Sequence, residues 1–564
     1  MKKNFLPLPA LLFLMVISLA SFGQLHPGKA ALHKEQPSDV YMPGQNTGQD
    51  FSPAYQIRSY NFFTTQVNIN GLGGNIPNDA ANEPSIAINP LNPMEMVIGW
   101  RQFDNINNNF RQAGFGYTTD GGETWTFPGV IDPGVFRSDP VLGCNSDGTF
   151  FYNSLTVDNQ GNYRCDVYKN LNNTFEWDNG TIAQGGDKQW MVIDGSGGVG
   201  DRNIYSFWTS FYSYCYPGNF TRSVDEGTSY EECISVNGDP YWGTMAVGPD
   251  GELYIAGSGY TGLVVARSTD AQYPGSTPGW DYAQQVDLDG EMTGWTTVNP
   301  EGLLGQAYID VDRSNGPGRG NVYVLASVQR NSSTDPADVM FSRSTDGGFT
   351  WDEPKRINTD LGTSSFQWFG TMSVSSNGRI DVVWLDTRDN PGTVLSSLYY
   401  SYSLDQGETW SPNERLSEEF DPHIGWPNQQ KMGDYFHMVS DNYHAHLAWA
   451  ATFNGEQDVY YGRITPLDPT GIPSSGSVHF TDLNCSPNPV SGRAVVRYFL
   501  PESGPARVTL YDVCGKPAKM LVNGTQEAGS QSVEFESDLL PAGAYYCRLQ
   551  AGKITDTRMI MVVK

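Results

Sequence analysis

One ten-residue pattern occurs three times in the chain at widely separated positions. It reads GYTTDGGETW at 116–125, SRSTDGGFTW at 342–351 and SYSLDQGETW at 401–410. Each copy follows one β-like run and precedes another, which is where the turn of a hairpin would stand. Weaker copies lie around Asp225 and Asp270, at a spacing of very roughly fifty residues. That period suits one four-stranded blade, so the repeat favours a β-propeller.

The recurring side chains have structural roles in this interpretation. The Asp accepts hydrogen bonds from turn amides, the Gly supplies positive φ, and the Trp packs under the loop between blades. The residues concerned are Asp120, Asp225, Asp270, Asp346, Asp405, Trp125, Trp351 and Trp410. We therefore expect no direct catalytic or metal-binding role for these Asp residues.

A second periodic element, a pair of strands, precedes the turns and occurs seven times between about 60 and 466. The 62 Gly and 35 Pro, with only 17% charged residues, also favour many short strands joined by tight turns. We predict an all-β fold with a seven-bladed propeller, and a six-bladed one stays open. The last unit lacks the turn pattern, and a strand from TQVNIN at 65–70 would complete its sheet and close the ring.

The two ends of the chain differ from the propeller. Residues 1–23 have a basic start, an apolar run and a small-residue cleavage site, as a signal peptide does. Residues 24–59 form an N-terminal extension, 467–477 a Pro/Ser/Gly-rich linker, and 478–564 a small β-sandwich of alternating strands. No later segment has the roughly 18 apolar residues of a membrane helix. We expect a monomer that is exported through the periplasm and is then secreted or anchored at the cell surface.

Charge and cysteines agree with that expectation. A formal net charge of −28 repels nucleic acid. In an oxidising compartment the seven Cys favour local disulfides, for which we predict Cys144 with Cys165, Cys215 with Cys233, and Cys514 with Cys547. Cys485 is left over. Buried free thiols are the alternative for each pair.

The candidate site follows from blade geometry. In an antiparallel blade the first strand starts on the face where the second strand ends, opposite the repeated turns, and functional residues are sought there. First-strand starts supply Glu83, Asp139, Gln189, Trp242, Gln306, Phe369 and Asp434, and neighbouring positions supply Arg101, Arg137, Asp187, Lys188, Trp368, Arg388 and Tyr435. Arginine forks bind carboxylates, acids transfer protons and Trp stacks on sugars, so the set fits an anionic or polyhydroxylated ligand.

The three intact S/T-x-D-x-G-x-T-W copies resemble the Asp-box, or BNR repeat, of the sialidase-like propellers. SPNPVSG, LPAGAYYCRLQAGK and the terminal MIMVVK resemble the type A C-terminal sorting domain of the type IX secretion system, known from the Bacteroidetes lineage. The second resemblance implies that the type IX machinery is a partner. An ordinary carbohydrate-binding sandwich is the alternative for this domain.

The sialidase-like resemblance implies a retaining exo-glycosidase with three arginines, a Tyr nucleophile and carboxylates. Carried over, it makes Tyr435 a candidate nucleophile, Asp139 or Glu83 a proton-transfer group, and Arg101, Arg137 and Arg388 an arginine cluster. The family's Arg-Ile-Pro signature is absent, and FRSDP at 136–140 is only a loose echo of it.

Each of these residues also has a purely structural alternative role. The acids would merely cap strands, the arginines would pair within their own loops, Lys188 would lie in a rim pair, and Tyr435 would line the channel. His437 and His446 lie in predicted strands and are read as core histidines. We recognise no closely spaced His and Cys ligand set and predict no metal or cofactor; a structural calcium ion stays open.

The leading hypothesis is an exported propeller that recognises a glycan or glycoprotein and hydrolyses terminal acidic sugars. Its rival is a non-catalytic surface propeller that binds host or matrix protein or polysaccharide. Whether the chain is an enzyme is left open, because propellers host many functions.

Overall fold

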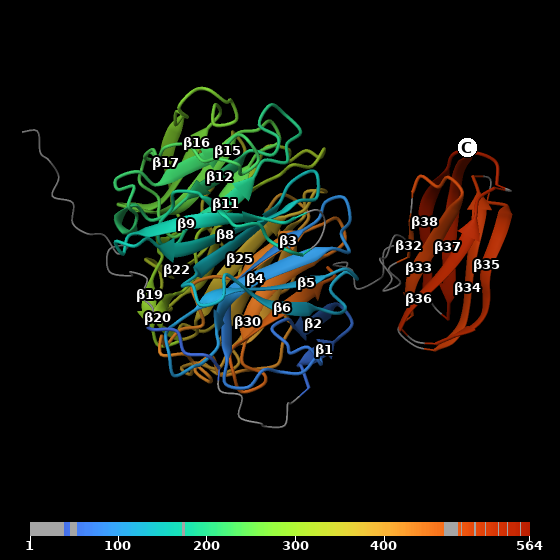
Figure 1. Cartoon of the computed structure of the whole chain (residues 1–564), viewed down its shortest axis with the longest axis horizontal. Helices are drawn as coiled ribbons and strands as arrows, with labels where there is room; N and C mark the ends of the chain where they lie inside the picture. The colour runs from blue at the N-terminus through green and yellow to red at the C-terminus, as the bar shows by residue number, and fades with distance from the viewer. Residues whose placement is uncertain are drawn as a thin grey trace, which may run out of the picture. The chain divides into compact units, whose positions relative to one another are not determined.

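The computed structural model describes residues 39–44, 53–171, 175–466 and 483–564, apart from 487, 501, 502, 514, 528, 539 and 553. This part is almost wholly β-structure, with one 3-10 helix, η1 (Ser210–Tyr212). It divides into two compact units, the first ending at Arg463 and the second beginning at Ile464 (Figure 1). Among these residues no helix is long and apolar enough to cross a membrane. The predicted signal peptide and the linker at 467–477 lie outside the described residues.

Seven antiparallel sheets make up the described part of the first unit, besides the pair of β19 (Gly294–Thr296) and β20 (Asn299–Leu303). The first sheet contains β3 (Ala80–Ile88), β4 (Met96–Phe103), β5 (Gln112–Thr118) and β6 (Thr126–Ile131). The second contains β7 (Ser138–Cys144), β8 (Phe150–Val157), β9 (Tyr163–Lys169) and β10 (Thr181–Ile182). The third contains β11 (Trp190–Ile193), β12 (Ile204–Phe207) and β13 (Phe220–Ser223). The fourth contains β14 (Met245–Val247), β15 (Leu253–Gly259), β16 (Gly262–Ser268) and β17 (Tyr282–Val286).

The remaining three sheets complete the unit. The fifth contains β18 (Gly290–Glu291), β21 (Tyr308–Val311), β22 (Val322–Arg330), β23 (Asp338–Ser344) and β24 (Lys355–Arg356). The sixth contains β25 (Gln367–Val374), β26 (Ile380–Asp386), β27 (Ser397–Ser403) and β28 (Glu414–Arg415). The seventh contains β29 (His437–Ser440), β30 (Ala445–Ala451), β31 (Asp458–Ile464), β2 (Phe62–Gln66) and β1 (Gln56–Arg58).

The first strands of these sheets contact one another in a closed ring. β3 contacts β7, and contacts continue through β11, β14, β21, β25 and β29 back to β3. The seventh sheet joins both ends of the propeller chain, because β2 lies beside β31 and the Val67 amide donates to the Val459 carbonyl at 2.8 Å. The predicted all-β propeller is therefore confirmed. One blade for each sheet remains our interpretation of the ring.

The repeated turns are held by the Asp side chains at their centre. Asp120 Oδ1 accepts from the Thr118 hydroxyl at 2.7 Å and from the Thr124 amide at 3.0 Å, and its Oδ2 accepts from the Thr124 hydroxyl at 2.6 Å. The turns around Asp225, Asp346 and Asp405 repeat these bonds. Asp270 makes the corresponding bonds to Ser268 and Gly279. The spacing in the sequence thus serves a local network of turn hydrogen bonds.

The Trp of the repeated turn packs against the neighbouring sheet. The ring of Trp125 lies 5.4 Å from that of Tyr461 in the seventh sheet. The ring of Trp410 lies 5.1 Å, nearly edge-on, from that of Phe341 in the fifth sheet. Trp351 packs on the core shared by the fourth and fifth sheets. Each such Trp buries apolar area between sheets, which explains its recurrence.

Only one predicted disulfide is present among the described cysteines of the first unit, Cys215–Cys233. The prediction for Cys144 and Cys165 is wrong, because both are free thiols. Cys144 lies opposite Phe150 and Cys165 opposite Leu155 of β8, five residues apart along that strand. That offset is roughly 16 Å, far beyond the reach of a disulfide. The third prediction involves Cys514, which lies outside the described residues.

The second unit is a two-sheet β-structure. One sheet contains β32 (Asn484–Ser486), β33 (Arg493–Leu500) and β36 (Gly529–Glu536). The other contains β35 (Pro517–Gln526), β34 (Gly504–Asp512), β37 (Gly543–Ala551) and β38 (Ile554–Val562). Apolar residues of both sheets, such as Val496 and Leu549, share one buried cluster. The predicted β-sandwich is what this unit forms (Figure 1).

Candidate functional site

The start of each first strand carries one residue with positive φ. Five of these are not glycine, with φ between 46° and 56°: Glu83, Asp139, Lys188, Trp242 and Phe369. In the fifth and seventh sheets the position is glycine, Gly305 and Gly433. Strand register shifts at three of the seven, which marks β-bulges, and a bulge re-aims the side chain it carries. Four of these seven residues coincide with the first-strand starts named from the sequence, and at the other three the sequence analysis named the following residue, Gln189, Gln306 and Asp434.

Three of these strand starts hold an ion-pair network that is closed to solvent. Lys188 Nζ lies 2.6 Å from Asp434 Oδ2, and Lys431 Nζ lies 2.7 Å from the same oxygen. Lys431 also lies 3.0 Å from Glu83 Oε1, and Arg101 Nε lies 3.2 Å from Glu83 Oε2. All five side chains are at most 1% exposed.

Backbone groups and further charges complete this network. Asp139 accepts from the Lys188 amide at 2.9 Å and from the Ser138 hydroxyl at 2.8 Å. Asp434 Oδ1 accepts from the Leu303 amide at 2.8 Å. Asp187 Oδ1 lies 3.7 Å from Lys188 Nζ. Buried charges persist in proteins when they are paired in this way.

Burial and pairing shift the ionisation of these groups in opposite directions. Desolvation raises the pKa of Glu83 to about 7, although Arg101 and Lys431 lower it. Burial also raises the pKa of Asp139, but the neighbouring cations outweigh this effect and hold the pKa below its usual value. Burial lowers the pKa of Lys431. The acids and cations therefore neutralise one another rather than a ligand.

The candidate nucleophile Tyr435 is part of the core. Its hydroxyl donates to the Pro140 carbonyl at 2.8 Å, and its ring lies 5.4 Å from that of Trp190. Burial raises the pKa of this hydroxyl well above its usual value. Tyr435 is 1% exposed. A phenol that is buried, hydrogen-bonded and hard to ionise is poorly suited to attack a sugar carbon.

The three candidate arginines pair with different carboxylates. Arg101 contacts Glu83, as described above. Arg137 lies 2.8 Å from Asp166 and 3.1 Å from Asp132. Arg388 lies 2.6 Å from Asp386 and 3.8 Å from Asp360, with its guanidinium 4.4 Å from the centre of the Tyr399 ring. Arg388 therefore follows the loop-pairing alternative through Asp386, whereas Arg137 pairs both with Asp132 of its own loop and with Asp166 of β9.

The two candidate tryptophans are buried as well. Trp242 is 1% exposed and packs edge-on against Tyr241. Trp368 is fully buried and donates to the Ser396 hydroxyl at 3.2 Å. Neither offers its face to a sugar from solvent. Among the ten predicted catalytic and binding residues, only Arg388 is partly exposed, with 15% of its side chain open to solvent.

Sequence reasoning missed two cations of the network. Lys431 precedes Asp434 by three residues in a segment without strand periodicity, so nothing local marked it. Arg111 is fully buried, and desolvation lowers its pKa to about 10 against the opposing charges of Asp139 and Asp187. Lys431 lies upstream of the first strand β29, whereas Arg111 directly precedes β5, the third strand of the first sheet, so a search at first-strand starts does not reach Arg111.

Two cavities lie away from the predicted residues. One, of about 400 Å³, is lined by residues of all seven first strands, with Ile86, Met191, Met372 and Val439 among its walls. The other, of about 300 Å³, lies between β13 and the loop that joins β16 to β17. We call the second the β13 pocket; Arg222, Glu231, Glu232, Ser276 and Thr277 are among its lining residues.

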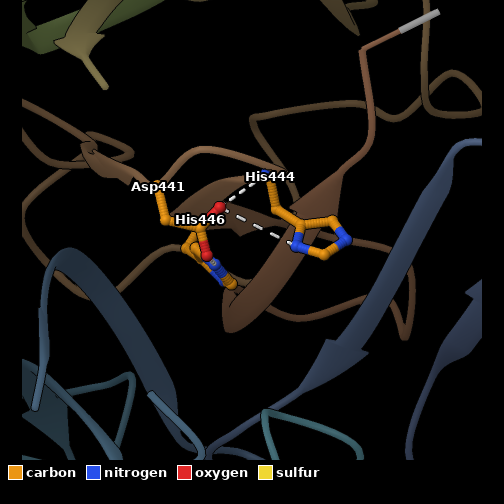
Figure 2. A group of neighbouring side chains, drawn as sticks. All are labelled: Asp441, His444 and His446. Carbon is orange, nitrogen blue, oxygen red and sulfur yellow. Dashed lines mark hydrogen bonds and ion pairs between the residues drawn. The ribbon is translucent and has the colours of Figure 1, made fainter. Parts of the chain in front are cut away.

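The turn between β29 and β30 gathers three further polar side chains. Asp441, His444 and His446 have potential ligand atoms within 4.8 Å of one another. Figure 2 shows one carboxylate oxygen of Asp441 facing the His444 ring and the other beside His446. Burial lowers the pKa of His444 to about 3, so its imidazole is neutral at pH 7. The D-x-x-H-x-H spacing is present in the sequence, but the apolar alternation around His446 favours a core histidine and gives no sign of the cluster.

No family model and no curated protein matches the chain. Among solved structures, a protein of unknown function from Dyadobacter fermentans is 14% identical, with a TM-score of 0.41, 72% of this chain covered and 98% of that one. The BP39L lectin from Burkholderia pseudomallei is 12% identical, with a TM-score of 0.43, covering 67% and 98%. A Trypanosoma rangeli sialidase is 9% identical, with a TM-score of 0.35, covering 90% and 89%.

Proposed function

We propose that this chain is an exported, non-catalytic propeller that binds a neutral polysaccharide through the β13 pocket. The observation that carries the proposal is the lining of that pocket, where the acids Glu231 and Glu232 and the hydroxyl residues Thr221, Ser276 and Thr277 lie beside apolar residues such as Phe220 and Ile234. The candidate catalytic residues Tyr435, Asp139 and Glu83 are instead buried, and each contacts other residues of the protein. The rival that the sequence left open, a binding propeller, is therefore the function the geometry favours.

The walls of the β13 pocket are held in place before any ligand arrives. Arg222 Nε and Nη2 donate to the Glu231 carboxylate at 2.8 and 3.2 Å. The same guanidinium donates to the carbonyls of Ala271 and Ser276 in the neighbouring sheet's loop. Thr221 donates to the Glu231 carbonyl at 2.6 Å. A preorganised wall lowers the entropic cost of binding.

The charge of the pocket selects against acidic sugars. Glu231 and Glu232 outnumber the single cation Arg222, which is itself fully buried and paired with Glu231. Carboxylates accept hydrogen bonds from sugar hydroxyls, while the carboxylate of an acidic sugar would be repelled. The net charge of −28 acts in the same direction. Neutral, polyhydroxylated chains are therefore the expected ligands.

A glycan array followed by calorimetry tests the proposal. We expect the purified chain to bind neutral polysaccharides in preference to sialylated ones, and to leave a fluorogenic sialoside intact. Glu232→Ala should weaken binding about tenfold or more, because a hydrogen bond to a charged group is worth about 1.5–3 kcal/mol. Glu353→Ala, at another exposed acid, is the matched control. Sialoside turnover that Tyr435→Phe abolishes would overturn the proposal, as would equal binding by both Glu variants.

A further inference from the structure

We propose that Asp441, His444 and His446 bind one divalent transition-metal ion, and that zinc fits the site best. Two imidazole nitrogens and one carboxylate oxygen lie within 4.8 Å of one another on a single turn. Such a mixed nitrogen and oxygen set suits zinc and its neighbours, whereas calcium and magnesium prefer oxygen ligands alone. This site is separate from the β13 pocket and does not depend on the proposed function.

The spacing of two ligand atoms already matches one ion. His446 Nε2 lies 3.2 Å from Asp441 Oδ2, while two ligands of a tetrahedral zinc ion at about 2.0 Å stand about 3.3 Å apart. His444 Nδ1 lies 3.9 Å from Asp441 Oδ1 and must move closer. Its side chain is 17% exposed, so its ring has room to rotate. Three protein ligands leave a fourth position for water or an added ligand.

The Tyr461 hydroxyl orients the His446 ring. Its Nδ1 lies 2.7 Å from the Tyr461 hydroxyl, on the side of the ring away from Asp441. With the proton on Nδ1, that nitrogen donates to Tyr461 and the lone pair of Nε2 faces the other two ligands. Tyr461 in turn reaches the Gly121 carbonyl at 3.5 Å. Hydrogen bonds of this kind fix the tautomer of metal-binding histidines and raise their affinity.

The turn that carries the ligands is fixed as well. Asp441 Oδ1 accepts from the amides of Tyr443 and His444, each at 2.6 Å. Arg379 donates to the carbonyls of Asp441 and His444 at 3.0 and 3.2 Å. The Arg379 contacts hold the backbone of the ligand turn without using ligand side-chain atoms, and the two amides occupy Oδ1 of Asp441 rather than Oδ2.

Two cations stand near the site, and each is neutralised by its own partner. Arg379 Nε lies 2.9 Å from Asp381 Oδ1, and Arg463 Nη2 lies 2.8 Å from Glu123 Oε1. Their repulsion of a bound metal ion is therefore reduced. Ser440, the residue before Asp441, lines the cavity of about 400 Å³ inside the first strands. An ion held here would stand beside the rim of that cavity.

Cobalt and zinc titrations test the site, using the full chain purified without a polyhistidine tag. We expect one Co²⁺ per chain with the intense visible bands of four-coordinate cobalt, and displacement of Co²⁺ by one equivalent of Zn²⁺. His444→Gln should weaken Zn²⁺ binding by at least about 100-fold and remove those bands. Tyr461→Phe keeps all three ligands and should weaken binding about tenfold, as the loss of an outer-shell partner does.

His423→Gln is the matched control, since His423 packs against Trp426 outside the site. Thermal unfolding without metal checks that every variant is folded, and Asp441→Asn serves in place of His444→Gln should the latter be unstable. Unchanged Zn²⁺ affinity in both ligand variants would place the bound ion elsewhere and overturn the proposal. Failure of the wild-type chain to bind Co²⁺ or Zn²⁺ would overturn it too.

Discussion

Lys188 and Asp434 form an ion pair of 2.6 Å between the third and seventh sheets, with both side chains 1% exposed. They are 246 residues apart in the chain. Lys188 lies in the segment that joins the second sheet to the third, and Asp434 lies just before the seventh sheet. The pair therefore connects two sheets that are not neighbours in the ring. Lys431 shares the same carboxylate oxygen, so three charges meet at one point.

Replacing Lys188 with Met should destabilise the chain strongly. The substitution keeps most of the volume but leaves Asp187 and Asp434 with less compensation in a site closed to water. Breaking a buried pair in this way costs about 3–5 kcal/mol. Urea unfolding followed by tryptophan fluorescence measures the loss.

Lys355→Met is the matched control for that change. Lys355 Nζ also pairs with a carboxylate, Glu408, at 2.9 Å, but its side chain is 35% exposed. A surface pair of this kind is worth at most about 1 kcal/mol. Similar losses for the two lysine variants would show that the central network is not energetically special.

Tyr435→Phe should affect stability and not ligand binding. It removes one hydroxyl and leaves the Pro140 carbonyl without the donor that now stands 2.8 Å away. An unsatisfied buried acceptor costs about 1–3 kcal/mol. Denaturant unfolding measures the cost, and Tyr260→Phe, at a tyrosine that is 73% exposed, should change stability by less than about 0.5 kcal/mol. A loss of glycan binding without a loss of stability would contradict the structural role of Tyr435.

The repeated turns were predictable from the sequence because their physics is local. Asp346, for example, bonds to Ser344 and Thr350 within its own turn, so the residue spacing carries the whole interaction. Strand alternation and turn spacing then gave the sheets in order. Closure by an N-terminal strand was also predicted, because the last unit lacked a partner for its outer edge, but the strand is β2 at Phe62–Gln66 rather than residues 65–70.

The character of the central residues was not predictable in the same way. Glu83, Lys431 and Arg101 come from three separate segments, and only the folded ring shows that they neutralise one another. A sequence pattern marks where a strand begins but not whether the residues there face solvent. The choice of Gln189 over Lys188 shows a second limit, because the sequence pattern does not show which residue before the strand takes positive φ.

Glu83→Gln should flatten the pH dependence of stability. The pKa of this carboxyl is raised from 4.5 in the unfolded chain to about 7 in the folded chain, chiefly by desolvation. Between those values the folded chain holds more protons, so stability falls as pH rises from about 4.5 to about 7. Gln resembles the protonated form and cannot lose a proton, so it removes this contribution.

Unfolding free energies at several values between pH 4.5 and 7 test this expectation. Asp187 has a pKa raised to about 7 by burial and contributes a slope of the same sign, so the variant should retain part of the dependence. Glu353→Gln, at an exposed carboxyl, should leave the profile unchanged. An identical slope in wild type and Glu83→Gln would mean that Glu83 stays ionised throughout the range.

Removing the Cys215–Cys233 disulfide should weaken both stability and glycan binding. The bridge spans 18 residues and encloses β13, and its second cysteine follows Glu231 and Glu232 of the β13 pocket. Closing a loop of that length lowers the entropy of the unfolded chain, which raises the free energy of unfolding by about 3 kcal/mol. The double Ser variant should therefore unfold at lower denaturant and bind glycan more weakly, because one wall of the pocket is less ordered. Cys144→Ser, at a free thiol, is the control. Unaltered glycan affinity in the double variant would show that the disulfide does not order the wall of the β13 pocket.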